Sequence, residues 1–195
     1  MKNTKKALLM TLCAVMLVAA SVMGTLAYLT STDTVTNTFT VGNVVITLDE
    51  APVDANGDKT TGDRVKANNY KLLPGHDYDK DPTIHVAEGS EDCYLFVKVT
   101  NEIAAIEDAT TVADQMKAKG WTLVQGTTDI YMHERVASAE DDVVVFETIK
   151  VKGEVDNTTL AAYANKTITV VAYAIQADGF ENSTPAQIWT AVGAK

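Results

Sequence analysis

Residues 93–100 read CYLFVKVT, a run in which every second side chain is apolar and uncharged. In an extended chain Cys93, Leu95, Val97 and Val99 therefore point to one face. β-Branched residues suit such a pleated surface, so this run predicts a strand with its odd-numbered side chains in a core. Further strands are predicted at 84–86, 121–124, 130–136, 143–151 and 167–175.

Three short stretches are predicted as helices, and all lie in connections between strands. They are 111–119, 158–164 and 184–189. The first has a capping hydroxyl at Thr110 or Thr111 and Gly120 just past its end. In the third, Pro185 takes the first helical position and Gly193 can stop the helix. Strands dominate, which predicts an all-β fold with short connecting helices, an antiparallel β-sandwich.

The first thirty residues have the layout of an export signal. Three lysines within the first six residues precede an uncharged apolar run, residues 7–23. Thr25 and Ala27 are small residues at the positions that a signal peptidase requires, which predicts cleavage between Ala27 and Tyr28. The chain then divides into a signal peptide, 1–27, and a single domain, 28–195.

A retained membrane anchor is the rival interpretation of the same region. Residues 7–29 are 23 residues without a charge, which is long enough to span a bilayer. In that case the chain contacts a membrane only through its uncleaved signal.

The charge of the chain excludes two classes of partner. Its 16 Lys+Arg oppose 26 Asp+Glu, a net charge of −10, and loss of the three signal lysines leaves −13. Nucleic-acid binding and adhesion to anionic membrane surfaces both need clustered positive charge, so neither is expected. Cys93 is the only cysteine after residue 27, so it is either a buried structural thiol or pairs between chains.

Acidic residues suggest two weak candidate metal sites. Their members are Asp54, Asn56 and Asp58, and then Asp77, Asp79 and Asp81. The first trio is spaced like the start of a calcium loop, but Lys59 and Val65 stand where an EF-hand has Gly and Glu. A solvated turn is the alternative there. The second trio alternates along the chain, and its alternative is a wet face or a charged strand edge.

Motifs of catalysis are missing from the sequence. His133 and Glu134 begin a zincin pattern, but the second histidine would stand at 137, which is Ala137. There is no Gly-x-Ser-x-Gly elbow and no P-loop. The sequence therefore predicts no enzymatic activity, no catalytic residue and no cofactor.

Residues 28–48 read YLTSTDTVTNTFTVGNVVITL and contain a single charge, Asp33, and no proline. This composition has high β-propensity and is typical of segments that add to a free sheet edge. The segment is either the first strand of its own domain or a donor strand that completes the sheet of a neighbouring copy. Head-to-tail donation does not close on itself and gives filaments.

The stretches GTLAYLTS (24–31) and TNTFTVGN (36–43) resemble the signal and first strand of the TasA/camelysin family. Weaker matches are LLPG at 72–75, KDP at 80–82, GSEDCY at 89–94 and the stretch 178–189. The resemblance implies a jelly-roll-like β-sandwich secreted by a Gram-positive bacterium into its extracellular matrix. It also implies biofilm fibres in which each N-terminal strand enters the next subunit.

Carried onto this chain, the resemblance gives residues for processing and for assembly. A SipW-type signal peptidase would recognise Thr25, Ala27 and Tyr28. The donor strand would run from Tyr28 to about Val41, and its inward anchors would be Val35, Phe39 and Val41. Other copies of the chain are the expected partners, and an accessory matrix protein is a further candidate. A camelysin-type surface metallopeptidase and a monomeric β-sandwich adhesin stay open as alternative functions.

Overall fold

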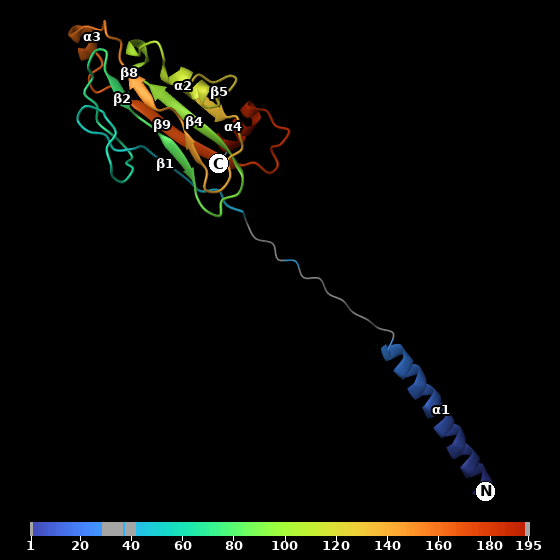
Figure 1. Ribbon diagram of the computed structural model, residues 1–195. Coiled ribbons are helices and arrows are strands. Elements are labelled where there is room, and N and C mark those ends of the chain that lie inside the picture. The colour runs from blue at the N-terminus through green and yellow to red at the C-terminus, as the bar shows by residue number, and fades with distance from the viewer. Residues whose placement is uncertain (1, 29–36, 38–41, 194–195) are drawn as a thin grey trace. The chain divides into compact units, whose positions relative to one another are not determined.

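The computed structural model describes residues 2–28, 37 and 42–193 (Figure 1). The chain divides into two compact units, Met1–Thr40 and Val41–Lys195. In the first unit, helix α1 spans Lys2–Tyr28, so Thr25, Ala27 and Tyr28, the residues predicted for processing, lie at its C-terminal end. Within the described residues, no helix combines the length and apolar character that crossing a bilayer demands.

The second unit consists mainly of antiparallel strands, with a few short helices in the connections. Its strands are β1 (Ile46–Asp49), β2 (Asp77–Asp79), β3 (Thr83–Val86), β4 (Cys93–Asn101), β5 (Trp121–Leu123), β6 (Ile130–His133), β7 (Asp142–Val144), β8 (Thr148–Lys150) and β9 (Ile168–Gln176). Its helical segments are a 3-10 turn η1 (Ala104–Ile106), α2 (Val112–Ala118), α3 (Asn157–Ala161) and α4 (Pro185–Gly193). The expectation of a β-rich fold with short connecting helices is confirmed.

The described strands pair in three sheets. One has the order β1-β3-β7, the second is β2-β8, and the third has the order β5-β6-β4-β9. All pairs are antiparallel, and β4 pairs with β9 from Cys93 opposite Gln176 to Asn101 opposite Ile168. Residues 46–48 belong to β1 and pair with β3 of the same chain, so they form part of this chain's own sheet.

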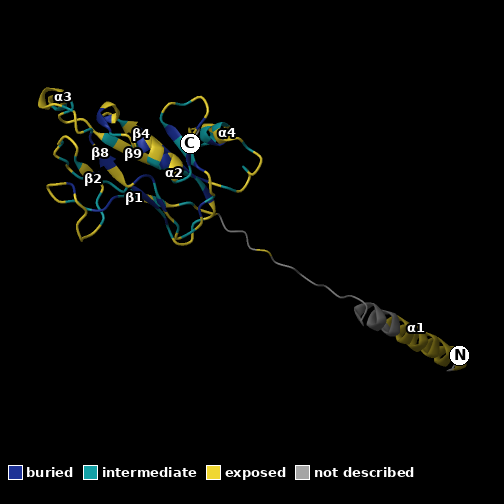
Figure 2. Cartoon of the chain, turned by 45° about the horizontal axis from the view of Figure 1, so that its top comes forward, coloured by how far each residue is buried: buried dark blue, intermediate teal, exposed yellow. Residues whose placement is uncertain are grey.

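Strand β4 confirms the alternation seen in its sequence. Cys93, Leu95 and Val97 are completely buried, and Val99 is 8% exposed. They belong to a core that also takes side chains from β1, β3, β7 and β9. Figure 2 shows these buried segments in dark blue. Phe96 is buried as well, on the opposite face, because Trp189 of α4 covers it at a ring distance of 5.5 Å.

Several predicted boundaries are wrong, and packing explains the largest error. The stretch 143–151 is not one strand but two, β7 and β8, which pair with different sheets. Val145 and Phe146 between them are both completely buried, which neighbouring residues of a strand packed on one face cannot be. Strand β6 ends at His133 rather than 136, α3 spans 157–161, and Gly193 lies inside α4 instead of stopping it. Strand β2 covers Asp77–Asp79, within the acidic stretch whose alternation is that of a strand.

The capping prediction for α2 is confirmed. Thr111 accepts a hydrogen bond from the backbone N–H of Asp114, whose carboxylate accepts one from the backbone N–H of Thr111. This reciprocal pair satisfies donors that a helix start leaves open. The predicted donor-strand anchors Val35, Phe39 and Val41 lie outside the described residues.

Candidate functional site

A groove opens between β1 and β9, which are edge strands of two different sheets. Each has a strand partner on only one side within the described part of the chain. A cavity of about 990 Å³ lies between them, lined by Leu48–Glu50 on one side and Ile168–Val170 on the other. The loop 66–72 and the segment 157–167 contribute to the other walls, together with Tyr78, Lys80, Pro82, Ile103 and Ile149. The groove is therefore bordered by the C-terminal end of β1 and the N-terminal end of β9, and both strands have an unpaired edge among the described residues.

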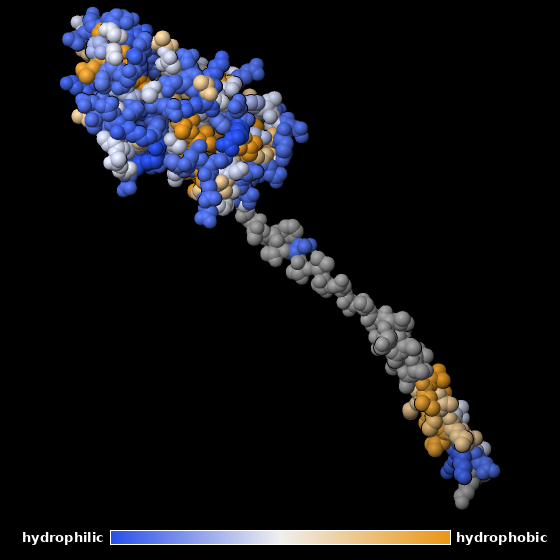
Figure 3. All heavy atoms as spheres, in the orientation of Figure 1, coloured by the Kyte–Doolittle hydropathy of each residue, from blue (hydrophilic) through white to orange (hydrophobic). Residues whose placement is uncertain are grey.

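The apolar side chains along both edges are only half-buried. They are Val44, Ile46 and Leu48 at β1, and Ile168, Val170, Ala172 and Ala174 on β9. One strand further in, Ile84 of β3 and Leu95 and Val97 of β4 are completely buried. Figure 3 shows orange apolar side chains among the blue surface over the strands. The core side chains are thus buried on the inner strands β3 and β4, and only partly covered on the edge strands β1 and β9.

The backbone of β9 turns away from β4 at the same positions. The N–H of Ala177 donates to the carbonyl of Asp92, and the N–H of Glu102 donates to the carbonyl of Thr167. In an antiparallel ladder of this register, alternate residues of β9 turn their N–H and C=O groups away from β4. They are Ile168, Val170, Ala172 and Ala174, and no hydrogen bond within the described residues uses those backbone groups.

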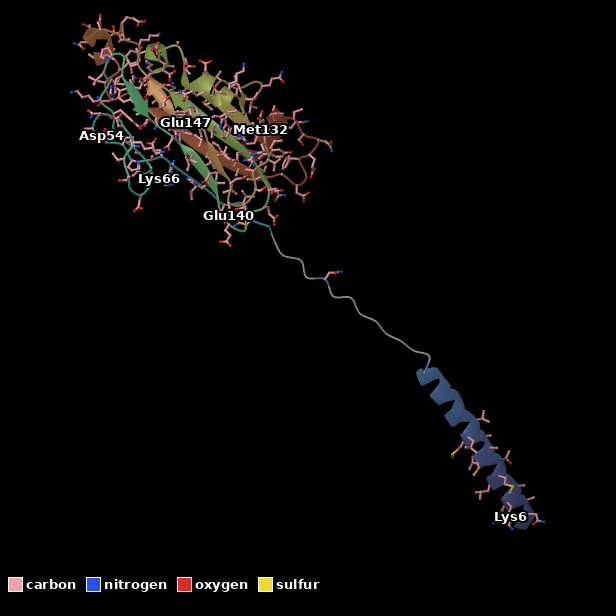
Figure 4. All side chains as sticks on the ribbon, in the orientation of Figure 1. Lys6, Asp54, Lys66, Met132, Glu140 and Glu147 are labelled. Carbon is pink, nitrogen blue, oxygen red and sulfur yellow. The ribbon has the colours of Figure 1, made fainter. Side chains whose placement is uncertain are left out.

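The free edge of β1 is partly occupied by its own loop. Glu50 exchanges two backbone hydrogen bonds with Val65, at 2.9 and 2.8 Å. The Nζ of Lys66 donates to the carbonyl of Leu48 at 2.6 Å. Figure 4 labels Lys66 on this loop. Among the residues that the structure describes, the backbone groups of Ile46 and the N–H of Leu48 have no hydrogen-bond partner.

An ion pair forms one polar wall of the groove. Lys80 and Glu50 lie 2.6 Å apart, and their side chains are 11% and 6% exposed. The Lys80 ammonium also lies 5.7 Å from the centre of the Tyr70 ring. Burial, with the nearby Glu50 charge, raises the pKa of Tyr70 well above its usual range, and its hydroxyl donates to the carbonyl of Asp79. These contacts hold the chain segment 50–80 against the edge of β1.

A charged cluster joins β1, β3 and β7 on the outer face of their sheet. His85 Nε2 lies 2.8 Å from Asp49, and its Nδ1 lies 2.5 Å from Asp142. Burial lowers the pKa of His85, but the hydrogen bonds to the two carboxylates outweigh it, so the net shift is upward. Arg64 binds Asp49 from the other side. A protonated His85 donates to both carboxylates and links all three strands.

The candidate metal ligands are bound to donors within the chain. Asp54, labelled in Figure 4, accepts from the backbone N–H groups of Asn56 and Asp58, and these hydrogen bonds lower its pKa. Asp77 faces Lys150, Asp79 accepts from the N–H of Lys59, and Asp81 binds Lys59 and Arg64. Among the described residues, no three His, Cys, Asp or Glu side chains are grouped to hold a metal ion.

His133 and Cys93, the other residues considered in the sequence, pack against neighbouring side chains in the fold. His133 lies on β6, with its ring centre 5.0 Å from that of Trp121. Cys93 is completely buried. Burial, with the charges of Asp92 and Asp141, raises the pKa of its thiol to about 11.

The groove itself was not foreseen from the sequence, because its two edges stand more than 100 residues apart in the chain. Glu50 and Lys66 belong to no motif in the sequence, and the KDP match at 80–82 did not indicate that Lys80 would border a groove. One signal was available: residues 168–176 read ITVVAYAIQ, with no charge and no proline. No protein-family model, curated protein or solved structure matches this chain.

Proposed function

We propose that this chain is a secreted structural subunit of extracellular-matrix fibres. Residues 28–41 of one copy add as a strand in the groove between β1 and β9 of the next copy. The observation that carries the proposal is the incompletely covered core: apolar side chains stay half-buried along two neighbouring strand edges, and several backbone groups on these edges have no hydrogen-bond partner among the described residues. A strand is the ligand that fits both features, because it supplies backbone partners at its edges and side chains on its face.

The N-terminal segment has the size and chemistry for this position. Residues 28–41 can extend over roughly 45 Å, whereas the nine residues of β9 span about 30 Å. Val35, Phe39 and Val41 occupy odd positions and would face the core together. Burying an apolar side chain of this kind stabilises by roughly 1.5–3 kcal/mol, so three anchors favour docking by about 4.5–9 kcal/mol before the cost of ordering the segment.

Export and family membership belong to the same proposal. The basic start, apolar run and small residues Thr25 and Ala27 support a signal peptide cut before Tyr28 by a SipW-type signal peptidase. The resemblance of the N-terminal motifs supports a TasA/camelysin-like, jelly-roll β-sandwich secreted by a Gram-positive bacterium. Processing would free the end of the segment that pairs.

Electron microscopy of negatively stained mature chain, residues 28–195, tests the proposal. Fibres are expected from this chain and not from one that starts at residue 42. Two substitutions sharpen the test: Val170→Lys places a charge in the groove, whereas Val171→Lys places the same charge on the opposite face, at a side chain already 40% exposed.

We expect Val171→Lys to form fibres and Val170→Lys to remain soluble. Circular dichroism of both variants verifies that they are folded. Equal fibre formation by the truncated chain or by Val170→Lys would overturn donor-strand assembly. A mature chain that stays monomeric at every pH and salt concentration would overturn the fibre function and favour the adhesin alternative.

A further inference from the structure

Natural proteins protect exposed strand edges, and the two edges of the groove differ in this respect. The usual devices are a lysine on the edge, a proline, a bulge or a covering loop. Strand β9 has nine residues without a charge or a proline. The backbone groups of its alternate residues 168–174 have no partner among the described residues. An edge this long and this apolar is a template for pairing with another chain.

Strand β1 carries two of the protective devices. Its end at Glu50 is covered by Val65 of the following loop. The ammonium of Lys66 takes the carbonyl of Leu48, which is the acceptor that the N–H of an added strand would need. An incoming strand would have to displace this charged hydrogen bond before it could pair along β1.

We infer that β9 is the edge that hydrogen-bonds the incoming strand and that Lys66 closes β1 to it. The inference rests on the fibre function proposed above, and its occupant is the 28–41 segment of a second copy. That segment becomes the next strand of the sheet β5-β6-β4-β9, beyond β9. β1 contributes only an apolar wall, through Ile46 and Leu48, and keeps its hydrogen bond to Lys66 in the assembled state.

Amide hydrogen exchange of the mature chain, before and after assembly, separates the two edges. The N–H groups of Val170, Ala172 and Ala174 are expected to exchange about a hundredfold more slowly in the fibre. The N–H groups of Ile46 and Leu48 should change by less than about threefold. Strong new protection at Ile46 and Leu48 with none on β9 would overturn the inference and leave the fibre function intact.

A proline substitution on β9 also tests whether this edge pairs with the incoming strand, and it does not require amide signals to be assigned to residues. The N–H of Ala172 points away from β4, along the unpaired edge of β9, so Ala172→Pro should leave the monomer folded while it removes a donor and blocks the edge. The matched change Val171→Pro removes an N–H that binds β4 and should unfold the domain. We expect Ala172→Pro to melt near the wild type and to form no fibres. Fibres from folded Ala172→Pro at the wild-type rate would refute pairing at β9.

Lys66→Met tests whether Lys66 closes the edge of β1, and Lys71→Met is its control on the same loop. Without the ammonium, β1 offers a second free edge, so Lys66→Met should associate laterally and scatter at least about threefold more light than Lys71→Met. Equal scattering by the two variants would refute the role of Lys66. Absence of fibres from the wild-type chain in these experiments would refute the proposed function itself, which is a separate outcome.

Discussion

Replacing Lys80 by methionine should destabilise the domain strongly, because it leaves a buried carboxylate without its partner. The side chain of Glu50 is 6% exposed, and Lys80 binds it at 2.6 Å. Removing one member of a buried ion pair costs about 3–5 kcal/mol. Loss of the Lys80 contact with the Tyr70 ring adds about 0.5–1 kcal/mol. For a domain of this size we expect a melting temperature lower by roughly 7–24 °C.

Lys59→Met is the matched control for that experiment. Lys59 pairs with Asp81 at 2.7 Å, but its side chain is 54% exposed. Solvent screening limits such a pair to about 0.2–1 kcal/mol. Urea denaturation of the wild type and both variants gives the two losses directly. If Lys80→Met and Lys59→Met cost the same, burial does not set the strength of the pair and the reasoning fails.

The double variant Glu50→Gln with Lys80→Met completes the cycle. It removes the buried charge together with its partner, so it should recover most of the stability that Lys80→Met loses. A double variant no more stable than Lys80→Met would show that the loss comes from packing and not from the uncompensated carboxylate.

Three further predictions concern pH, thiol chemistry and salt. The raised pKa of His85 means that its bridge between Asp49 and Asp142 stabilises the fold below its usual pKa of 6.5, and that this contribution disappears as pH rises through the folded-state pKa. His85→Gln should therefore lower the melting temperature more at about pH 5.5 than at about pH 8.5, and an equal loss at both would contradict the bridge. Cys93 is completely buried with a pKa of about 11, so a maleimide should modify it only after denaturation, and rapid labelling of the folded chain would disprove its burial. A chain cut before Tyr28, as proposed, would carry −13, so its fibre formation should accelerate with added salt, and turbidity traces that do not depend on ionic strength would rule out charge repulsion as a barrier.

The sequence alone determined the elements whose signals are local. The alternation at 93–99 placed the central strand, because a strand with one buried face repeats every two residues. The hydroxyl at Thr111 and the glycine that follows the helix placed α2, because capping depends on neighbours only a few residues away. The composition of 28–48 likewise indicated a segment with a tendency to add to a sheet, without naming the place where it would bind.

Only the tertiary structure decided how distant segments meet. It split 143–151 into β7 and β8, because Val145 and Phe146 are buried where the chain passes from one sheet to another. It brought β1 and β9 to either side of one groove, and it set the ammonium of Lys66 on the edge of β1. An alternating pattern indicates which face of a strand is buried, but it does not indicate which of the two edges of the strand is paired. Which edge stays free is fixed by pairing between residues far apart in the chain, and that pairing exists only once the chain has folded.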